Sequence, residues 1–276
     1  MLKQRIITAL ILLALLLPSL VLQDPRWFVL LTLGLMAAGA WEWGRLQGLA
    51  VWPALACGAV VGMLLVAIWM WAPNVHAPSL WILGVLIWLP GGLWLLRSGL
   101  SRWSHIARTW RLLVGWLAIA LAWLALVAAK GQGLNFLLSV LTLVWAADVA
   151  AYFGGRAWGR RKLAEHISPG KTWAGAWSGV AAVGCLGLLW LWADTQWDWG
   201  SASLYTVLWQ RSPVLLPVGV ALLVGLSIGG DLVESLIKRV AGVKDSSGLL
   251  PGHGGVLDRV DALLPVLPVA MWLSVV

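Results

Sequence analysis

The second half of the chain carries charged side chains inside and beside long apolar segments, where charge is costly. Four polar residues near the end of one segment recur at helical spacing and share one helix face: Asp231, Glu234, Ser235 and Lys238. Asp258 opens the next segment and shares a face with Asp261. An acidic side chain in a membrane helix costs several kcal/mol unless it faces a partner or a wet cavity, so each indicates a functional site.

A loop of turn-forming residues, 243–255, joins these two segments and is rich in groups that bind phosphate. It contains Lys244 and His253, and Arg239 and Arg259 flank it. Hard cations such as Mg²⁺ take oxygen ligands, commonly one or two carboxylates plus substrate phosphates, while lysine and arginine neutralise the remaining charge. The composition predicts nucleotidyl or phosphoryl transfer at a nucleotide phosphate. The alternative is a set of buried ion pairs that only hold helices together.

A third polar group precedes these two. Asp148 lies late in an apolar segment, with Tyr152 four residues on and therefore on the same helix face. We expect Asp148 to position a lysine or arginine or to bind metal.

The elements that position these residues must be membrane helices. Apolar residues make up 61% of the chain and charged residues 11%, whereas soluble domains have about 45–50% and about 25%. These values exclude a soluble globular protein. Long unbroken apolar runs, such as residues 10–17, exclude a β-barrel, whose strands alternate in polarity. The predicted fold is an all-α, polytopic integral membrane protein.

Apolar runs bounded by charge, proline and glycine predict nine membrane crossings. They cover residues 6–22, 27–46, 51–72, 79–96, 110–129, 134–153, 173–193, 213–237 and 261–276. We expect residues 1–139 to form N-terminal transmembrane helices and residues 140–276 to form a catalytic region with its loops in the cytoplasm.

The distribution of basic residues predicts the orientation. Sixteen of the nineteen lysines and arginines fall on one side of this arrangement, together with the N-terminus and its Lys3 and Arg5. Basic residues accumulate in cytoplasmic loops, so the N-terminus is expected in the cytoplasm. The loop 97–111, with four arginines, is expected to lie at the same surface. The net charge of +8 then favours anionic lipid or phosphorylated substrates as partners, and not nucleic acid.

The segment from Ser235 to Asp261 closely resembles the C-terminal signature of phosphatidate cytidylyltransferases, also called CDP-diacylglycerol synthases. Each fixed position of that 27-residue pattern is filled. The similarity extends upstream to Asp148, Tyr152, Arg156 and Gly159, and to Ile167–Gly175, with departures from the family at Gly170 and Ala174. It covers residues 140–276, whereas residues 1–139 match only in spanning the membrane repeatedly.

This resemblance implies the transfer of CMP from CTP to phosphatidate, giving CDP-diacylglycerol and pyrophosphate in phospholipid biosynthesis. It implies Mg²⁺ as cofactor and a bacterial inner membrane with the active site on the cytoplasmic side. The expected metal ligands are Asp231 and Asp258. The expected catalytic residues also include Lys238, Arg239 and His253. Substrate binding is expected from Ser168, Lys171, Thr172, Ser235, Lys244, Arg259, Asp148 and Arg156.

Two roles stay open from the sequence. Lys171, Ser168 and Thr172 are expected to bind either the triphosphate or the lipid phosphate. His253 is expected either to shape its loop and donate to a phosphate or to act as a general base, which an already anionic phosphate monoester does not need.

Two other functions compete with this interpretation. One is another membrane transferase acting on a lipid phosphate, such as a CDP-alcohol phosphotransferase, whose aspartate-rich pattern is absent from the sequence. The other is a transporter, which would predict an inverted repeat, whereas the charged motifs occur only in the second half. The sequence leaves a homo-oligomer open.

Overall fold

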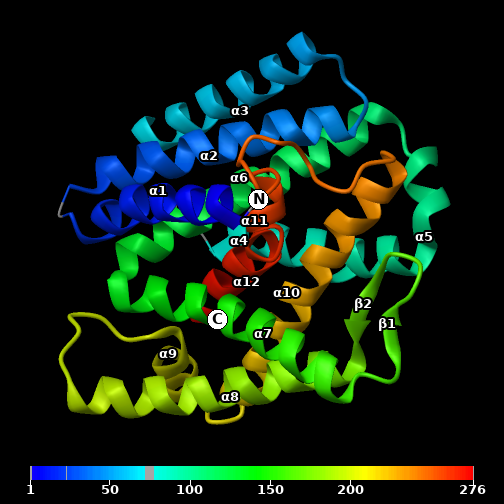
Figure 1. Ribbon diagram of the computed structural model, residues 1–276. Coiled ribbons are helices and arrows are strands. Elements are labelled where there is room, and N and C mark those ends of the chain that lie inside the picture. The colour runs from blue at the N-terminus through cyan, green and yellow to red at the C-terminus, as the bar shows by residue number, and fades with distance from the viewer. Residues whose placement is uncertain (1, 23, 72–77, 276) are drawn as a thin grey trace.

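The computed structural model describes residues 2–22, 24–71 and 78–275, and in them the chain folds into a helical bundle with one small hairpin (Figure 1). Six of its helical segments are long and apolar enough to cross a membrane: Val51–Trp71, Pro78–His105, Arg108–Gln132, Leu134–Trp158, Trp173–Gln196 and Leu215–Val240. The protein is therefore a polytopic α-helical membrane protein. Residues 72 and 276, where two predicted segments end, and the side chains of Lys3 and Arg5 lie outside the described part.

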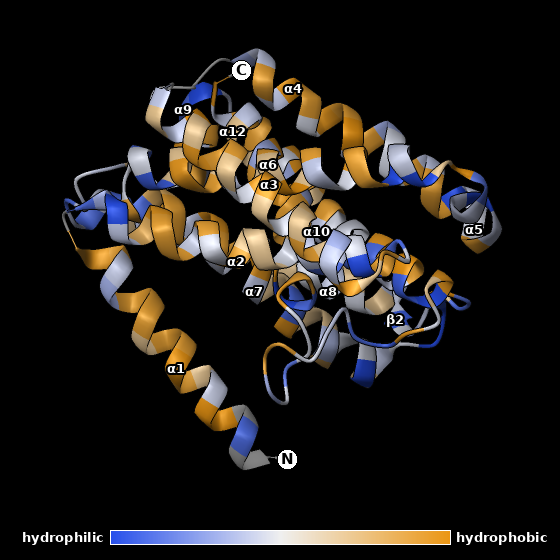
Figure 2. Ribbon diagram, turned by 90° about the horizontal axis from the view of Figure 1, so that it is seen from above, coloured by the Kyte–Doolittle hydropathy of each residue, from blue (hydrophilic) through white to orange (hydrophobic). Residues whose placement is uncertain are grey.

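The N-terminal helices are α1 (Leu2–Val21), α2 (Pro25–Leu46) and α3 (Val51–Trp71). Helix α2 begins cleanly because Pro25 occupies its first turn and the Asp24 carboxylate accepts the Arg26 backbone N–H. Close packing of α2 and α3 requires Gly58, where a Cβ would meet the Ala37 carbonyl oxygen. Figure 2 shows that α1 is apolar along most of its length, as a lipid-facing helix must be.

The fourth predicted segment belongs to a longer, interrupted helix. It consists of α4 (Pro78–Leu86), the π-turn η1 (Ile87–Gly92) and α5 (Leu93–His105). Pro90 lies in η1 and has no N–H to continue an α-helical ladder, which accounts for the widened turn. A kink at Gly99, with φ 76° and ψ −175°, interrupts α5 close to the predicted end of this crossing at residue 96. Residues beyond the kink are helical to His105, and α6 (Arg108–Gln132) follows almost at once, so the segment 97–111 is mostly helical and not the predicted loop.

A β-hairpin joins α7 (Leu134–Trp158) to α8 (Trp173–Gln196). Its strands β1 (Lys162–Ala164) and β2 (Ser168–Thr172) are antiparallel, an element that an all-α prediction lacks. The Thr172 hydroxyl accepts the Gly175 backbone N–H at 3.1 Å and caps α8. Strand β2 of the hairpin therefore places Lys171 directly before the start of α8.

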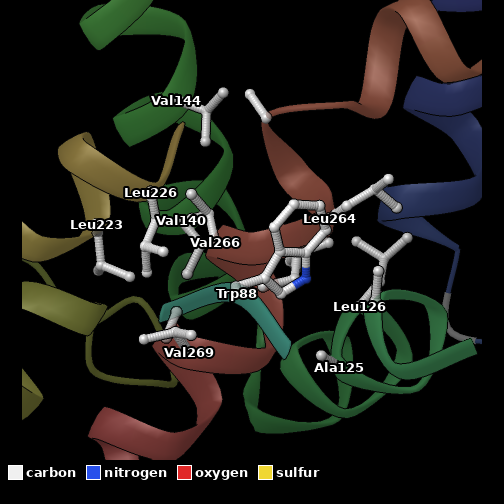
Figure 3. Packing of buried hydrophobic residues seen from close by; sticks show 14 of the residues in the cluster. Trp88, Ala125, Leu126, Val140, Val144, Leu223, Leu226, Leu264, Val266 and Val269 are labelled. Atoms are coloured by element: carbon white, nitrogen blue, oxygen red, sulfur yellow. The ribbon is translucent and has the colours of Figure 1, made fainter. Parts of the chain in front are cut away.

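The last helices are α9 (Leu204–Arg211), α10 (Leu215–Val240), α11 (Leu257–Val260) and α12 (Leu263–Val275). Helix α12 lies in the centre of the bundle, and Figure 3 shows its Val266 and Val269 among side chains from α6, α7 and α10. It is apolar on all sides, which suits a helix surrounded by protein. The predicted crossings at α1, α2 and α12 are also helical, but these three helices are not among the six long apolar segments named above.

Candidate active site

One ion pair joins the hairpin to α10. The Lys171 Nζ of β2 lies 2.5 Å from the Asp231 Oδ2 of α10, and both side chains are partly exposed. The other carboxylate oxygen of Asp231 accepts a hydrogen bond from the Ser235 hydroxyl at 3.1 Å, one helical turn along. The pairing of Asp231 with Ser235 follows from their i, i+4 spacing. The pairing with Lys171 depends on the tertiary fold.

A cavity of about 400 Å³ surrounds this ion pair. Its polar lining contains five of the predicted site residues: Asp148, Ser168, Lys171, Thr172 and Asp231. They come from α7, β2 and α10, three elements that are separated in the chain but adjacent here. Two acidic and several donor groups thus face one hollow that admits a phosphate-sized group.

A second charged group lies further along α10 and is more deeply buried. The Lys238 Nζ lies 2.7 Å from Glu234 Oε2 and 2.5 Å from Asp258 Oδ1. All three side chains are mostly buried, and none is among the described residues that line the 400 Å³ cavity. This arrangement agrees with the alternative interpretation of buried ion pairs for Lys238 and Glu234.

Asp258 also organises the loop that precedes it, residues 243–256, which we call the signature loop. Its Oδ2 accepts hydrogen bonds from the Ser246 N–H at 2.8 Å, the Ser246 hydroxyl at 2.9 Å and the Gly255 N–H at 2.7 Å. Burial alone would raise the pKa of the Asp258 carboxyl, but the hydrogen bonds from Lys238, Gly255 and Ser246 outweigh burial and hold the pKa below its ordinary value. Asp258 therefore stays ionised at neutral pH.

The remaining predicted basic residues lie at the surface. Arg239, Lys244, Arg259 and Arg156 are exposed. Within the described residues none of the four forms a salt bridge, so their charges are available to ligands at the surface. Arg156 lies 3.5 Å from the Tyr152 hydroxyl.

His253 occupies a turn of the signature loop between two glycines. The backbone N–H of His253 donates to the Leu250 carbonyl at 2.8 Å. Gly252 and Gly254 have positive φ angles of 77° and 83°, a conformation that favours glycine. The His253 Nδ1 is buried without a hydrogen-bond partner among the described residues. The histidine is thus part of a tightly turned loop.

One residue outside the predicted set, Glu42, also contacts this region. Glu42 of α2 is fully buried, and its carboxylate accepts hydrogen bonds from the signature loop and from the start of α11. The available signal was its type, because an acidic residue inside an apolar segment indicates a functional site by default. The signature motif drew attention to the second half of the chain only.

The donor set fits the Mg²⁺ that the motif implies. No three His, Cys, Asp or Glu side chains converge within the described ranges. Mg²⁺, however, commonly uses only one or two protein carboxylates together with substrate phosphates. Asp231 and Asp148 line the same cavity and supply such oxygens. Asp258 Oδ2 is occupied by its loop, and Oδ1 faces Lys238.

The structure is that of a polytopic helical membrane protein with a charged cavity, and comparison of the full sequence shows its family. The model of the cytidylyltransferase family matches residues 3–276, so the chain belongs to this family. It is 40% identical to the phosphatidate cytidylyltransferase of Pseudomonas aeruginosa, over 98% of this chain and 95% of that protein. The enzyme of the same name from Haemophilus influenzae is 33% identical, over 97% of this chain and 96% of that protein. The resemblance inferred from the motifs is confirmed.

Proposed function

We propose that the protein transfers the cytidylyl group of CTP to phosphatidate, giving CDP-diacylglycerol and pyrophosphate. The observation that carries this proposal is the cavity around the Lys171–Asp231 pair, built from the family motifs within a membrane bundle. Similarity along nearly the whole chain to proteins named phosphatidate cytidylyltransferase supports the same reaction.

The reaction requires mainly the placement and neutralisation of phosphates. A phosphate oxygen of phosphatidate forms a bond to the α-phosphorus of CTP, the bond from that phosphorus to the bridging oxygen breaks, and pyrophosphate leaves. Lys171 offsets phosphate charge inside the cavity, while Ser168, Thr172 and Ser235 offer hydroxyls near it. The attacking phosphate is already anionic, so we assign His253 to loop shape and phosphate binding.

Bound Mg²⁺ would supply further charge neutralisation on the phosphates. Asp231 would hold it, with Asp148 beside it on the same cavity. Asp258 does not line this cavity and its Oδ1 pairs with Lys238, so it would act as the second ligand only if Lys238 gave up this contact when the metal and substrate bind. Arg239, Lys244 and Arg259, exposed near the signature loop, would bind phosphates that enter from the aqueous side.

An apolar cavity supports a lipid as the acceptor. It has a volume of about 270 Å³ and is lined mainly by tryptophan and aliphatic side chains of η1, α5, α6 and α10. Glu234 and Val233 line this cavity, whereas Asp231 and Ile228 line the polar one, so α10 separates the two. A substrate with an anionic headgroup and apolar chains matches this pair of environments.

The same proposal includes the topology. We infer nine crossings, with α4, η1 and α5 acting as one, and a cytoplasmic N-terminus. The hairpin and the signature loop then lie on the cytoplasmic side of the inner membrane, where CTP is available. Residues 140–276 form the catalytic region in this assignment.

Product analysis tests the reaction type. Purified protein in detergent, given CTP, phosphatidate and Mg²⁺, should release pyrophosphate in equal amount to CDP-diacylglycerol. Release of CMP, with CDP-lipid consumed as the donor, would instead show a CDP-alcohol phosphotransferase. In a separate assay with the protein reconstituted into vesicles, movement of phosphatidate across the vesicle membrane without any chemical product would instead show a transporter.

A further inference from the structure

Glu42 has a hydrogen-bond arrangement that links the N-terminal helices to the signature loop. Its side chain is 0% exposed. Oε1 accepts hydrogen bonds from the Ser247 hydroxyl at 2.6 Å and the Val256 N–H at 2.9 Å. Oε2 accepts the Leu257 N–H at 2.8 Å and lies 3.1 Å from the Ser246 hydroxyl. All four partners belong to the segment 246–257, more than 200 residues away in sequence.

These hydrogen bonds are what makes the buried charge tolerable. A buried carboxylate is strongly unfavourable unless it is paired or fully hydrogen-bonded. No ion pair of the described residues involves Glu42, so the loop itself supplies the compensation. Hydrogen bonds to a charged acceptor are stronger than neutral ones. The Ser247 hydroxyl and the Val256 and Leu257 N–H groups are three independent donors, and the single Ser246 hydroxyl proton is shared with Asp258, so these contacts hold both ends of the loop to α2.

The same contacts connect Glu42 to Asp258 through one residue. The Ser246 hydroxyl lies within hydrogen-bond distance of Glu42 Oε2 and of Asp258 Oδ2, at 3.1 and 2.9 Å. Gly255 fits between the two acidic groups because it has no side chain; a Cβ there would collide with Ser246 Oγ and Glu42 Oε1. Displacement of Glu42 must therefore disturb Ser246 and Gly255, which hold the Asp258 carboxylate.

We propose that Glu42 is a positioning residue for the transfer reaction, and that it fixes the signature loop and the Asp258 carboxylate without touching substrate. This proposal rests on the proposed function for its catalytic consequence only. It assigns an essential contact to the half of the chain that carries no motif. Residues 140–276 would then be unable to form the site without α2.

Amide hydrogen exchange of the full-length protein in detergent tests the structural part without substrate. In Glu42→Gln, the NH2 group of the amide faces other donors and cannot accept the hydrogen bonds that one carboxylate oxygen accepts in the wild type. We expect exchange across residues 246–257 to become at least about tenfold faster, because glutamine has one acceptor oxygen, so either the Val256 or the Leu257 amide loses its acceptor and faces an NH2 group instead. Exchange in α8 and α9 should stay as in the wild type.

Kinetics with the same protein test the catalytic part. We expect kcat to fall at least about tenfold in Glu42→Gln, with a smaller change in KM for CTP, because the loop must be reordered before each turnover. Glu42→Asp retains the charge but is one methylene shorter, so it should fail in the same way. If the charge alone mattered, Glu42→Asp would keep wild-type kcat, and the proposal would be wrong.

Asp194→Asn is the matched control. The Asp194 carboxylate also accepts several hydrogen bonds, from Asn135, Thr206 and the Ser203 N–H, but it joins α7, α8 and α9. We expect it to lower Tm while kcat and signature-loop exchange stay unchanged. If both variants lose kcat in proportion to Tm, Glu42 acts only through general stability and the proposal is overturned.

Ser247→Ala provides the measurement if Glu42→Gln does not fold, because it removes one of the four donors from the loop side. A smaller increase in exchange over residues 246–257 and a smaller fall in kcat are expected. Faster exchange with unchanged kcat, or lower kcat with unchanged exchange, would contradict the positioning role. If no cytidylyl transfer occurs even in the wild type, the exchange result still decides whether Glu42 holds the loop.

Discussion

Lys171 and Asp231 bring together the hairpin and α10 at the polar cavity, and each is the other's nearest opposite charge. Substitution Lys171→Met should lower kcat/KM for CTP about 10- to 100-fold, because a charge-assisted contact to phosphate is worth about 1.5–3 kcal/mol. Lys162→Met is the control, since Lys162 is exposed on the neighbouring strand β1. Equal activity of the two variants in a CTP titration would remove Lys171 from the site.

At the residue level, the sequence predicted contacts that depend on local spacing. Asp231 and Ser235 share a helix face by the i, i+4 rule, and their hydrogen bond is present. The partner of Asp231, however, is Lys171, 60 positions earlier, and the loop's acceptor is Glu42. Such contacts arise from the packing of distant helices, which a periodic pattern in one segment does not encode.

At the level of elements, α10 and α12 meet through Gly230. A Cβ at this position would meet the Asp261 carbonyl and the Pro265 ring, whereas a Cβ at Gly229 would meet no atom within 4 Å. We therefore expect Gly230→Ala to cost about 1–3 kcal/mol, measured as a lower Tm, with reduced activity. Gly229→Ala should be neutral or slightly stabilising in the same thermal unfolding experiment. The reverse order would show that the two helices are packed differently.

The signature loop should respond to acid through Asp258. A carboxyl whose pKa is lowered on folding stabilises the folded state above its ordinary pKa, and this contribution is lost as the pH falls through the lowered value. The Tm difference between wild type and Asp258→Asn should therefore be constant from about pH 7 to about pH 5 and shrink below about pH 4. A difference that already vanishes near about pH 6 would mean a raised pKa and a different set of contacts.

Whether a segment is a membrane helix was predictable where its composition determines this. Breaks and turns that depend on single residues were less predictable. Long apolar runs placed the helices, because backbone groups in lipid must be satisfied within the segment. The predicted crossing 79–96 included neither the π-turn at Pro90 nor the kink at Gly99, since the apolar run alone does not indicate where a helix deforms. The hairpin 162–172 is short and polar, so the sequence has no alternating apolar pattern that would predict its strands.

For the whole molecule, the topology follows from charge and can be measured directly. Single cysteines at Ser101, Glu165 and Asp198, all exposed, are introduced after replacing Cys57 and Cys185 by alanine. A membrane-impermeant maleimide added to intact cells should label position 198 only, and positions 101 and 165 only after lysis. Labelling of 101 or 165 in intact cells would overturn the orientation.

The proposed reaction is tested most directly by the transfer of ³²P from α-labelled CTP into chloroform-soluble lipid by purified protein in detergent. We predict label in the lipid only when phosphatidate and Mg²⁺ are both present. The Asp231→Asn variant should give no label, although a thermal unfolding curve should show that it is folded. Asp198→Asn, an exposed acidic residue of the α8–α9 loop, should transfer label like the wild type. Absence of label with folded wild-type protein, or equal transfer by Asp231→Asn, would contradict the proposed reaction or its site, respectively.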